Sequence, residues 1–208
     1  EHKTLPKTIE IQNIRKLFKY VYKIKSDFNK MEKYSYKALT RDIAILELLF
    51  ATGLRVSEVS NIKYYDINLG TGNIKVLGKG GKERNIQVCD QEVKIALKEY
   101  LSLFKDEILE KEWFFINRLG NKFTEHSIAN MIKKYQTKAN VQQHLTPHMF
   151  RHSFATMLLE EGVDIRYIQG MLGHASISTT QIYTQINMKQ QRKILSTKHP
   201  RRNLQFLA

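Results

Sequence analysis

The apolar residues of this 208-residue chain change their spacing in one stretch, and that change limits the folds that the chain can adopt. Before residue 64 and after residue 90 they recur every three or four positions, which is the spacing of one helical face. Residues 73–77 and 83–88 are instead short β-rich runs, joined by a glycine-rich stretch with the composition of a hairpin turn. The pattern predicts a mainly α fold with a small antiparallel β-sheet inserted.

Capping residues indicate where several of these helices begin and end. Gly53 follows an apolar helical face and suits a helix C-cap. Asp90 and Thr146 suit N-caps, and Pro147 after Thr146 fits the first helical position. We also expect the following elements: a helix over residues 11–21, a polar loop over 26–36, a short helix capped by Ser57 and running toward Tyr64, an extended piece at 113–116, a helix over 125–139, a helix end at Gly162, and short helices after Asp164 and Ser178.

The chain carries a large excess of positive charge. It has 34 Lys and Arg against 20 Asp and Glu, which gives a formal net charge of +14. Each phosphate that a Lys or Arg neutralises releases condensed counterions, so the excess favours a polyanionic partner. Nucleic acid is the partner that this charge indicates first.

The cysteine content and the apolar runs bear on the compartment. Cys89 is the only cysteine, which rules out an intrachain disulfide and favours a reducing environment. No uninterrupted apolar run is long enough to cross a bilayer, and residues 1–8 lack the apolar core of a signal peptide. We therefore expect a cytoplasmic protein with no membrane partner.

Three stretches of the chain differ in character. Residues 1–8 are polar, contain Pro6 and have the composition of a linker between domains. Residues 9–190 are enough to bury the core of one domain. Residues 191–208 form a basic tail, since no acidic residue occurs after Thr184. The prediction is one domain with a linker before it and a tail behind it.

Two arginines and a histidine are suited to hold a phosphate. Arg55 follows the helix end at Gly53, and Arg151 lies shortly after the helix start at Thr146. A guanidinium group is permanently charged, and its planar fork matches phosphate oxygens. The free N–H groups and the dipole of a helix N-terminus favour an anion as well. His148 lies three positions before Arg151 and shares its helical face, so both could hold one phosphate.

A lysine, a second histidine and a tyrosine complete a set suited to breaking a phosphodiester, which needs charge stabilisation, a nucleophile in line and a proton for the leaving oxygen. Lys79 lies at the tip of the glycine-rich hairpin, where it could enter a groove and protonate a 5′ oxygen. Tyr183 is the candidate nucleophile. Its ordinary pKa is about 10, so it needs a base such as His148 or a cationic pocket. His174 would help to polarise the phosphate.

Other kinds of site fit the residues less well. His144, His148 and His152 are spaced by four, but Pro147 interrupts the helix and Arg151 would add positive charge beside a metal. The glycine-rich hairpin lacks the Ser or Thr and the opening glycine of a nucleotide phosphate loop. No paired acidic cluster supports two-metal hydrolysis. We therefore expect neither a metal nor a nucleotide cofactor.

Five short segments follow one another along the chain: residues 51–58 (ATGLRVSE), 78–84 (GKGGKER), 147–156 (PHMFRHSFAT), 172–174 (LGH) and 180–183 (TQIY). Taken in this order, they resemble the tyrosine recombinase (phage integrase) family, and the likeness is to its Xer-like and transposon integrase branch. The similarity extends from about Lys37 to about Lys189, with no catalytic position missing.

The resemblance implies the catalytic-domain fold of that family and a role for each matching residue. Arg55 and Arg151 would bind the phosphate, Lys79 would be the general acid, and His148 would accept or orient a proton. His174 would be a second phosphate hydrogen-bond donor, and Tyr183 would attack to give a 3′-phosphotyrosyl link and a free 5′ hydroxyl. Glu58 matches an acidic position that supports the active site; from the sequence it could equally be an exposed helix carboxylate.

The resemblance also implies partners and an assembly. The family acts on double-stranded DNA as a homotetramer on two sites, with an N-terminal core-binding domain, which would lie upstream of the linker, and a C-terminal segment passed to a neighbouring protomer. The tail of this chain could dock in that way through Leu204, Phe206 and Leu207, or it could be a disordered basic tail that touches DNA. The sequence therefore predicts a site-specific DNA recombinase that acts by transesterification. A type IB-like topoisomerase and a DNA-binding protein without catalysis are the alternatives.

Overall fold

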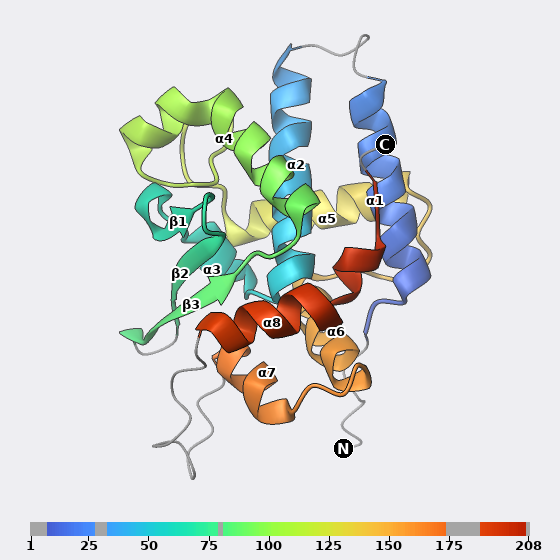
Figure 1. Ribbon diagram of the computed structural model, residues 1–208. Helices are drawn as coiled ribbons and strands as arrows, with labels where there is room; N and C mark the ends of the chain where they lie inside the picture. Colours follow the sequence, from blue (N-terminus) through green and yellow to red (C-terminus); the bar gives the residue numbers. More distant parts are fainter. Residues whose placement is uncertain (1–7, 28–32, 79–80, 174–187, 207–208) are drawn as a thin grey trace, which may run out of the picture.

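The structure is a computed structural model that describes residues 8–27, 33–78, 81–173 and 188–206. Helix α2 (Lys33–Thr52) runs through its middle, and all of its side chains from Leu39 to Thr52 are buried (Figure 1). Four helices pack around it: α1 (Ile11–Ser26), α4 (Gln91–Lys111), α5 (Glu125–Lys138) and α6 (Pro147–Glu160). The apolar spacing predicted a single buried face for α2, whereas the helix is enclosed on all sides from Leu39 to Thr52.

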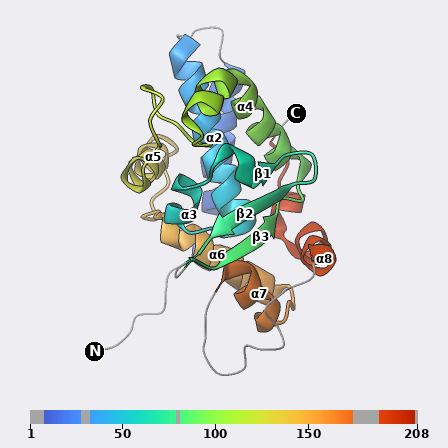
Figure 2. The same cartoon turned by 90° about the vertical axis from the view of Figure 1, so that its left-hand side faces the viewer.

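The inserted sheet lies beside this helical core (Figure 2). Its three antiparallel strands follow the order β1 (Ile67–Asn68), β2 (Asn73–Leu77) and β3 (Glu83–Gln87). Ile74 pairs with Ile86, and both side chains are fully buried. The mainly helical fold with a small antiparallel sheet is therefore confirmed, and the short strand β1 is an addition that the sequence pattern did not predict.

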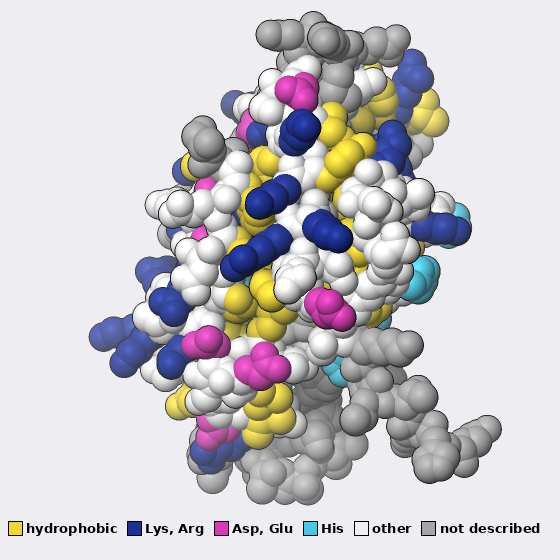
Figure 3. Space-filling model, turned by 90° about the vertical axis from the view of Figure 1, so that its right-hand side faces the viewer, with side chains coloured by type: hydrophobic (Ala, Val, Ile, Leu, Met, Phe, Trp, Pro, Cys, Tyr) yellow, Lys and Arg dark blue, Asp and Glu magenta, His cyan; other side chains and the backbone are white. Residues whose placement is uncertain are grey.

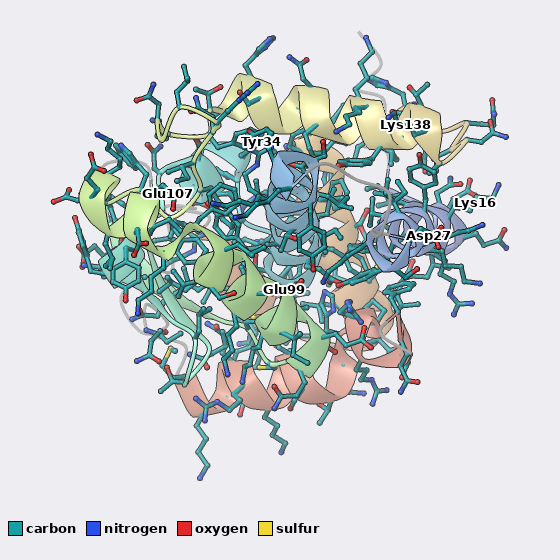
Figure 4. All side chains as sticks on the ribbon, turned by 90° about the horizontal axis from the view of Figure 1, so that it is seen from above. Lys16, Asp27, Tyr34, Glu99, Glu107 and Lys138 are labelled. Atoms are coloured by element: carbon teal, nitrogen blue, oxygen red, sulfur yellow. The ribbon has the colours of Figure 1, made fainter. Side chains whose placement is uncertain are left out.

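The loop that we expected over residues 26–36 ends earlier than predicted, because α2 already begins at Lys33. Contacts to α4 hold this first part of the helix (Figure 4). The Tyr36 hydroxyl donates to Glu99 at 2.6 Å, and Lys37 Nζ lies 2.9 Å from Glu107. Because these partners are more than 60 positions away, local polarity gave no sign of the helix.

The short helix after α2 also differs from the expectation. Helix α3 (Val56–Ser60) has Arg55 at its N-cap rather than Ser57, and it ends before the 3₁₀ turn η2 (Tyr64–Asp66). The Glu58 carboxylate accepts the Arg55 backbone N–H, so the side chain of the third helical residue caps the helix start. The predicted extended piece at residues 113–116 makes only isolated bridges, from Trp113 to Lys63 and from Ile116 to Lys122.

The helix start at Thr146 is where the sequence placed it. The Thr146 hydroxyl accepts the N–H of Met149, and the helix that follows, α6, leads through Gly162, which has φ +76°, to α7 (Ile165–Leu172). The Asp164 side chain caps α7 by accepting the Arg166 N–H. The helix expected after Ser178 lies outside the described residues.

The C-terminal segment packs on its own chain. Helix α8 (Met188–Lys198) crosses position 190, where we expected the tail to begin, and the 3₁₀ turn η4 (Pro200–Asn203) follows it. The Gln191 side chain bonds the backbone of β3, accepting the Gln87 N–H at 2.6 Å and donating to Asn85 O at 3.1 Å. The described part of the tail therefore packs on the core of its own chain.

Aromatic stacking and a buried ion pair hold the end of this segment against the core. The ring of Phe206 stacks on Phe18 and Tyr22, with centroids 5.3 and 5.7 Å apart. Arg201 is 1% exposed and binds the fully buried Glu47 of α2 through Nε and Nη2, at 2.7 and 2.8 Å.

In the described part of the chain, no helix is long and apolar enough to cross a membrane.

Candidate active site

The turn between α2 and α3 brings Arg55 to the surface of the core. Gly53 has φ +62°, a conformation that favours glycine, and it lets the chain leave α2 sharply. A Cβ at this position would lie 2.7 Å from the ring of Phe154, so the missing side chain also allows α6 to approach. Arg55 comes two residues later, with its side chain 35% exposed.

The Arg151 side chain bridges the C-terminal ends of α2 and α7. Its side chain is buried, and it donates through Nη1 to Gly53 O at 2.9 Å and through Nη2 to Leu172 O at 2.7 Å. Burial and the neighbouring charge of Arg55 lower the pKa of Arg151 to about 10, so it keeps its charge at neutral pH. Arg55 Nη1 approaches the same Leu172 oxygen at 3.5 Å. The two predicted phosphate clamps thus meet at the C-terminus of α7.

Glu58 is a buried carboxylate between two arginines, not an exposed one. It is 6% exposed, and its Oε1 accepts from Arg55 Nη1 at 2.9 Å. Arg84 of β3 binds both oxygens, with Nη1 to Oε1 at 2.6 Å and Nη2 to Oε2 at 2.9 Å. Burial alone would raise the pKa of Glu58, but the hydrogen bonds and charges of Arg84 and Arg55 outweigh it and leave the pKa below its ordinary value.

Arg84 is a site residue that the sequence analysis did not single out. It belongs to the segment 78–84 that carries the family resemblance, but a strand arginine beside a turn is usually exposed. Its partners Glu58 and Met171 lie 26 and 87 positions away, so only the folded chain brings them together. Alternation along β3 was the one available signal, because it sets Arg84 apart from its exposed neighbours Glu83 and Asn85.

His148 lies at the second position of α6, exposed at the start of the helix that carries Arg151. Its ring meets that of His152 edge to face, with centroids 5.1 Å apart. Burial, His148 and Arg151 lower the pKa of His152, so this second imidazole is neutral at pH 7. The neutral ring of His152 therefore lies directly against His148, the predicted proton acceptor.

Lys79, His174 and Tyr183 lie outside the described residues. The chain is described up to Gly78 and again from Gly81, and it is described up to Gly173 before His174: Gly78 donates its N–H to Lys82 O at 2.8 Å, and Gly173 ends α7 with φ +66°. Of the seven predicted site residues, the structure therefore places Arg55, Glu58, His148 and Arg151. Three of these, Arg55, Glu58 and Arg151, are brought into one cluster together with Arg84.

The electrostatics of this cluster favour an anion. The cluster contains three guanidinium groups, of which Arg55 and Arg84 bind Glu58, and one carboxylate, which leaves a local excess of positive charge. Within the described residues, Arg55 makes its side-chain hydrogen bonds through Nη1 only, so Nε and Nη2 can meet phosphate oxygens. The same residues contain no group of three or more His, Cys, Asp or Glu side chains that could hold a metal ion.

Positive charge is also exposed away from the cluster. On the face shown in Figure 3, Lys and Arg side chains gather over α1. The exposed cations of that helix are Arg15, Lys16, Lys19 and Lys23. Such a surface raises the local concentration of a polyanion and makes its binding dependent on salt.

The chain is similar to known proteins over most of its length. A family model described as the phage integrase family matches residues 14–190. A tyrosine recombinase of Agathobacter rectalis is 46% identical over 202 residues, which cover 97% of this chain and 65% of that protein. The crystal structure of XerA recombinase superposes with a TM-score of 0.69 at 33% identity, covering 93% of this chain and 65% of that one. XerH recombinase bound to its difH substrate, in a pre-cleavage complex, gives a TM-score of 0.69 at 26% identity and covers 89% and 52%.

Proposed function

This chain belongs to the phage integrase family, the tyrosine recombinases, and we propose that it is a site-specific DNA recombinase that cleaves and rejoins strands by transesterification. The observation that carries the proposal is the convergence of Arg55 and Arg151 on Leu172 O, beside the buried Glu58. The chain spans 65% of the length of the relative from Agathobacter rectalis, so the activity of a whole recombinase is inferred for it.

In the proposed cleavage step, the Tyr183 hydroxyl attacks the scissile phosphorus. A bond forms between its oxygen and phosphorus, and the bond from phosphorus to the 5′ oxygen breaks. The tyrosine proton passes to His148, and Lys79 donates a proton to the leaving oxygen, which becomes a free 5′ hydroxyl. Arg55, Arg151 and His174 would stabilise the charge on the non-bridging oxygens, and loss of one such donor typically costs about 10²- to 10³-fold in rate.

The reverse reaction rejoins the strands. A 5′ hydroxyl attacks the phosphotyrosyl bond and releases Tyr183, so the energy of the phosphodiester is kept in the covalent link. Neither a metal nor a nucleotide is required by this chemistry, since guanidinium groups supply the charge stabilisation and the intermediate stores the bond energy.

The proposal includes the partners and the location. Double-stranded DNA is the substrate, as supported by the positive charge and by the similarity to XerH bound to difH. A homotetramer on two DNA sites, an N-terminal core-binding domain upstream of a catalytic domain at 9–190, and work in the cytoplasm belong to the same proposal. Exchange of the tail between protomers would require Arg201 to leave Glu47 of its own chain and meet that of a neighbour.

The test is covalent trapping on a nicked duplex. The duplex is selected from a random pool by repeated binding to the protein, and a nick just 3′ of the scissile phosphate lets the short fragment diffuse away after cleavage. A protein–DNA adduct should appear on a denaturing gel and be absent for Tyr183→Phe, which should still bind the duplex. An adduct formed by Tyr183→Phe would contradict the assigned nucleophile. Relaxation of supercoiled plasmid without any specific site would instead favour a topoisomerase.

A further inference from the structure

We infer that Arg84 is a positioning residue for strand cleavage, holding Glu58, and through it Arg55, in register with the segments that carry Lys79 and His174. The inference rests on the function proposed above. Arg84 is a strand residue whose side chain is only 13% exposed, and it binds both oxygens of Glu58 while donating from Nε to Met171 O at 2.8 Å. It thus joins β3, α3 and the end of α7.

Two glycines pass directly beside this guanidinium. A Cβ built on Gly173 would lie 3.0 Å from Arg84 Nη1, and one built on Gly78 would lie 3.7 Å from the same atom. In the sequence, Gly78 directly precedes Lys79, and Gly173 directly precedes His174. A side chain at either glycine would therefore meet the Arg84 guanidinium, so the described chain just before Lys79 and just before His174 lies close to one side chain.

The contacts require the shape of arginine as well as its charge. The fork meets the carboxylate with two parallel hydrogen bonds, and the third donor, Nε, faces the Met171 carbonyl. A lysine ammonium is a single charged point and cannot reproduce this arrangement. Because Glu58 also holds Arg55, a shift of the carboxylate would move a phosphate clamp.

Loss of Arg84 should therefore slow cleavage more than it weakens DNA binding. A displacement of about 1 Å in a reacting group can cost about 10²-fold in rate. Arg84 itself lies mostly buried against Glu58, so it adds little to the surface that attracts DNA. The expected signature is a lower rate of adduct formation at saturating DNA, with affinity for the duplex nearly unchanged.

The experiment measures single-turnover adduct formation on the selected nicked duplex for Arg84→Gln and Arg84→Lys. Lys75→Gln is the matched control, because it removes one positive charge from the same sheet, where Lys75 pairs with the surface carboxylates Asp66 and Glu83. Arg84→Gln should lower the rate constant by about 10²-fold. Arg84→Lys should recover part of it, and Lys75→Gln should leave it unchanged.

The pH dependence of the rate of adduct formation provides a second test. Without Arg84, Glu58 loses the larger of the two influences that lower its pKa and keeps only Arg55, so the rate of Arg84→Gln should begin to fall at a higher pH than that of the wild type as the solution is acidified. If Arg84 only supported the fold, Arg84→Gln would lower the fraction of protein that reacts, but the rate constant and the pH at which the rate begins to fall would match those of the wild type. That result would overturn the inference.

A double variant keeps the inference testable if Arg84→Gln folds poorly with Glu58 unpaired. Glu58→Gln with Arg84→Gln leaves two neutral amides at the buried site and no unpaired carboxylate, while Arg55 stays partly exposed to solvent. If Arg84 acts through Glu58, the double variant should be no slower than the slower single variant; rate losses that multiply would overturn the inference. A wild-type chain without a Tyr183-dependent adduct would overturn the proposed function as well, whereas wild-type rates in Arg84→Gln would overturn this inference alone.

Discussion

Arg201→Ala is expected to destabilise the protein strongly, because it leaves a carboxylate buried without its partner. Arg201 is 1% exposed and Glu47 is 0% exposed, and the two share hydrogen bonds at 2.7 and 2.8 Å. Arg201 also binds Glu92 at 2.8 Å and the Leu204 carbonyl. Breaking a buried ion pair by removing one partner typically costs about 3–5 kcal/mol. For a chain of this length that corresponds to a fall of about 6–20 °C in Tm.

The adjacent arginine supplies the control. Arg202 is exposed, so Arg202→Ala should change the free energy of unfolding by no more than about 0.5 kcal/mol. Urea unfolding followed by far-UV circular dichroism compares the two variants at pH 8 and pH 5. A loss below about 1 kcal/mol for Arg201→Ala, or equal losses for the two variants, would refute the argument from burial.

Comparing the two pH values shows whether the loss of unfolding free energy grows or shrinks as the pH rises. Burial raises the pKa of Glu47, while Arg201 and Tyr22 oppose the rise. Without Arg201 the pKa rises further, so the penalty of the buried charge is absent below the ordinary pKa of a glutamate and grows as the pH rises toward the folded value. The loss caused by Arg201→Ala should therefore be smaller at pH 5 than at pH 8. A loss that grows on acidification would contradict this account.

Three further outcomes are expected. The Glu58 pKa lies below its ordinary value, so its stabilisation is present above about pH 4.3 and lost as the pH falls; unfolding free energies measured from pH 7 to pH 3 should drop less for Glu58→Gln than for the wild type. Gly53→Ala should lower Tm more than Gly162→Ala, because both positions have positive φ but only a Cβ at Gly53 meets a neighbour, at 2.7 Å; equal losses would contradict the steric argument. Lys198→Ala should weaken duplex binding and reduce its salt slope by about 1, as checked by titrations at several salt concentrations, whereas an unchanged slope would mean that Lys198 touches no phosphate.

Elements that depend on neighbouring residues could be predicted from the sequence. The Thr146 cap, the glycine at the end of α2 and the paired strands β2 and β3 each carry their signal within a few positions. The burial of α2 on every side from Leu39 onward could not be read in this way, because a buried charge such as Glu47 finds its partner far along the chain. Arg201, for example, is 154 positions from Glu47.

The same division applies to the candidate site. Arg55, His148 and Arg151 stand in local segments whose residue types indicate phosphate chemistry, and the structure joins the two arginines through Leu172 O. Arg84 was missed because its role depends on a contact between a strand and a helix. The basic composition of residues 191–208 predicted a tail, but the contacts of Gln191 and Arg201 with the core decide how that segment packs.

Chemical mapping of the protein–DNA adduct tests most directly whether cleavage proceeds through a link to Tyr183. After proteolysis and nuclease digestion, mass spectrometry identifies the peptide that carries the nucleotide and the end through which it is joined. We predict a 3′-phosphoryl link to Tyr183 and a free 5′ hydroxyl on the released strand. A nucleotide attached to another residue, or joined through a 5′ phosphate, would contradict it.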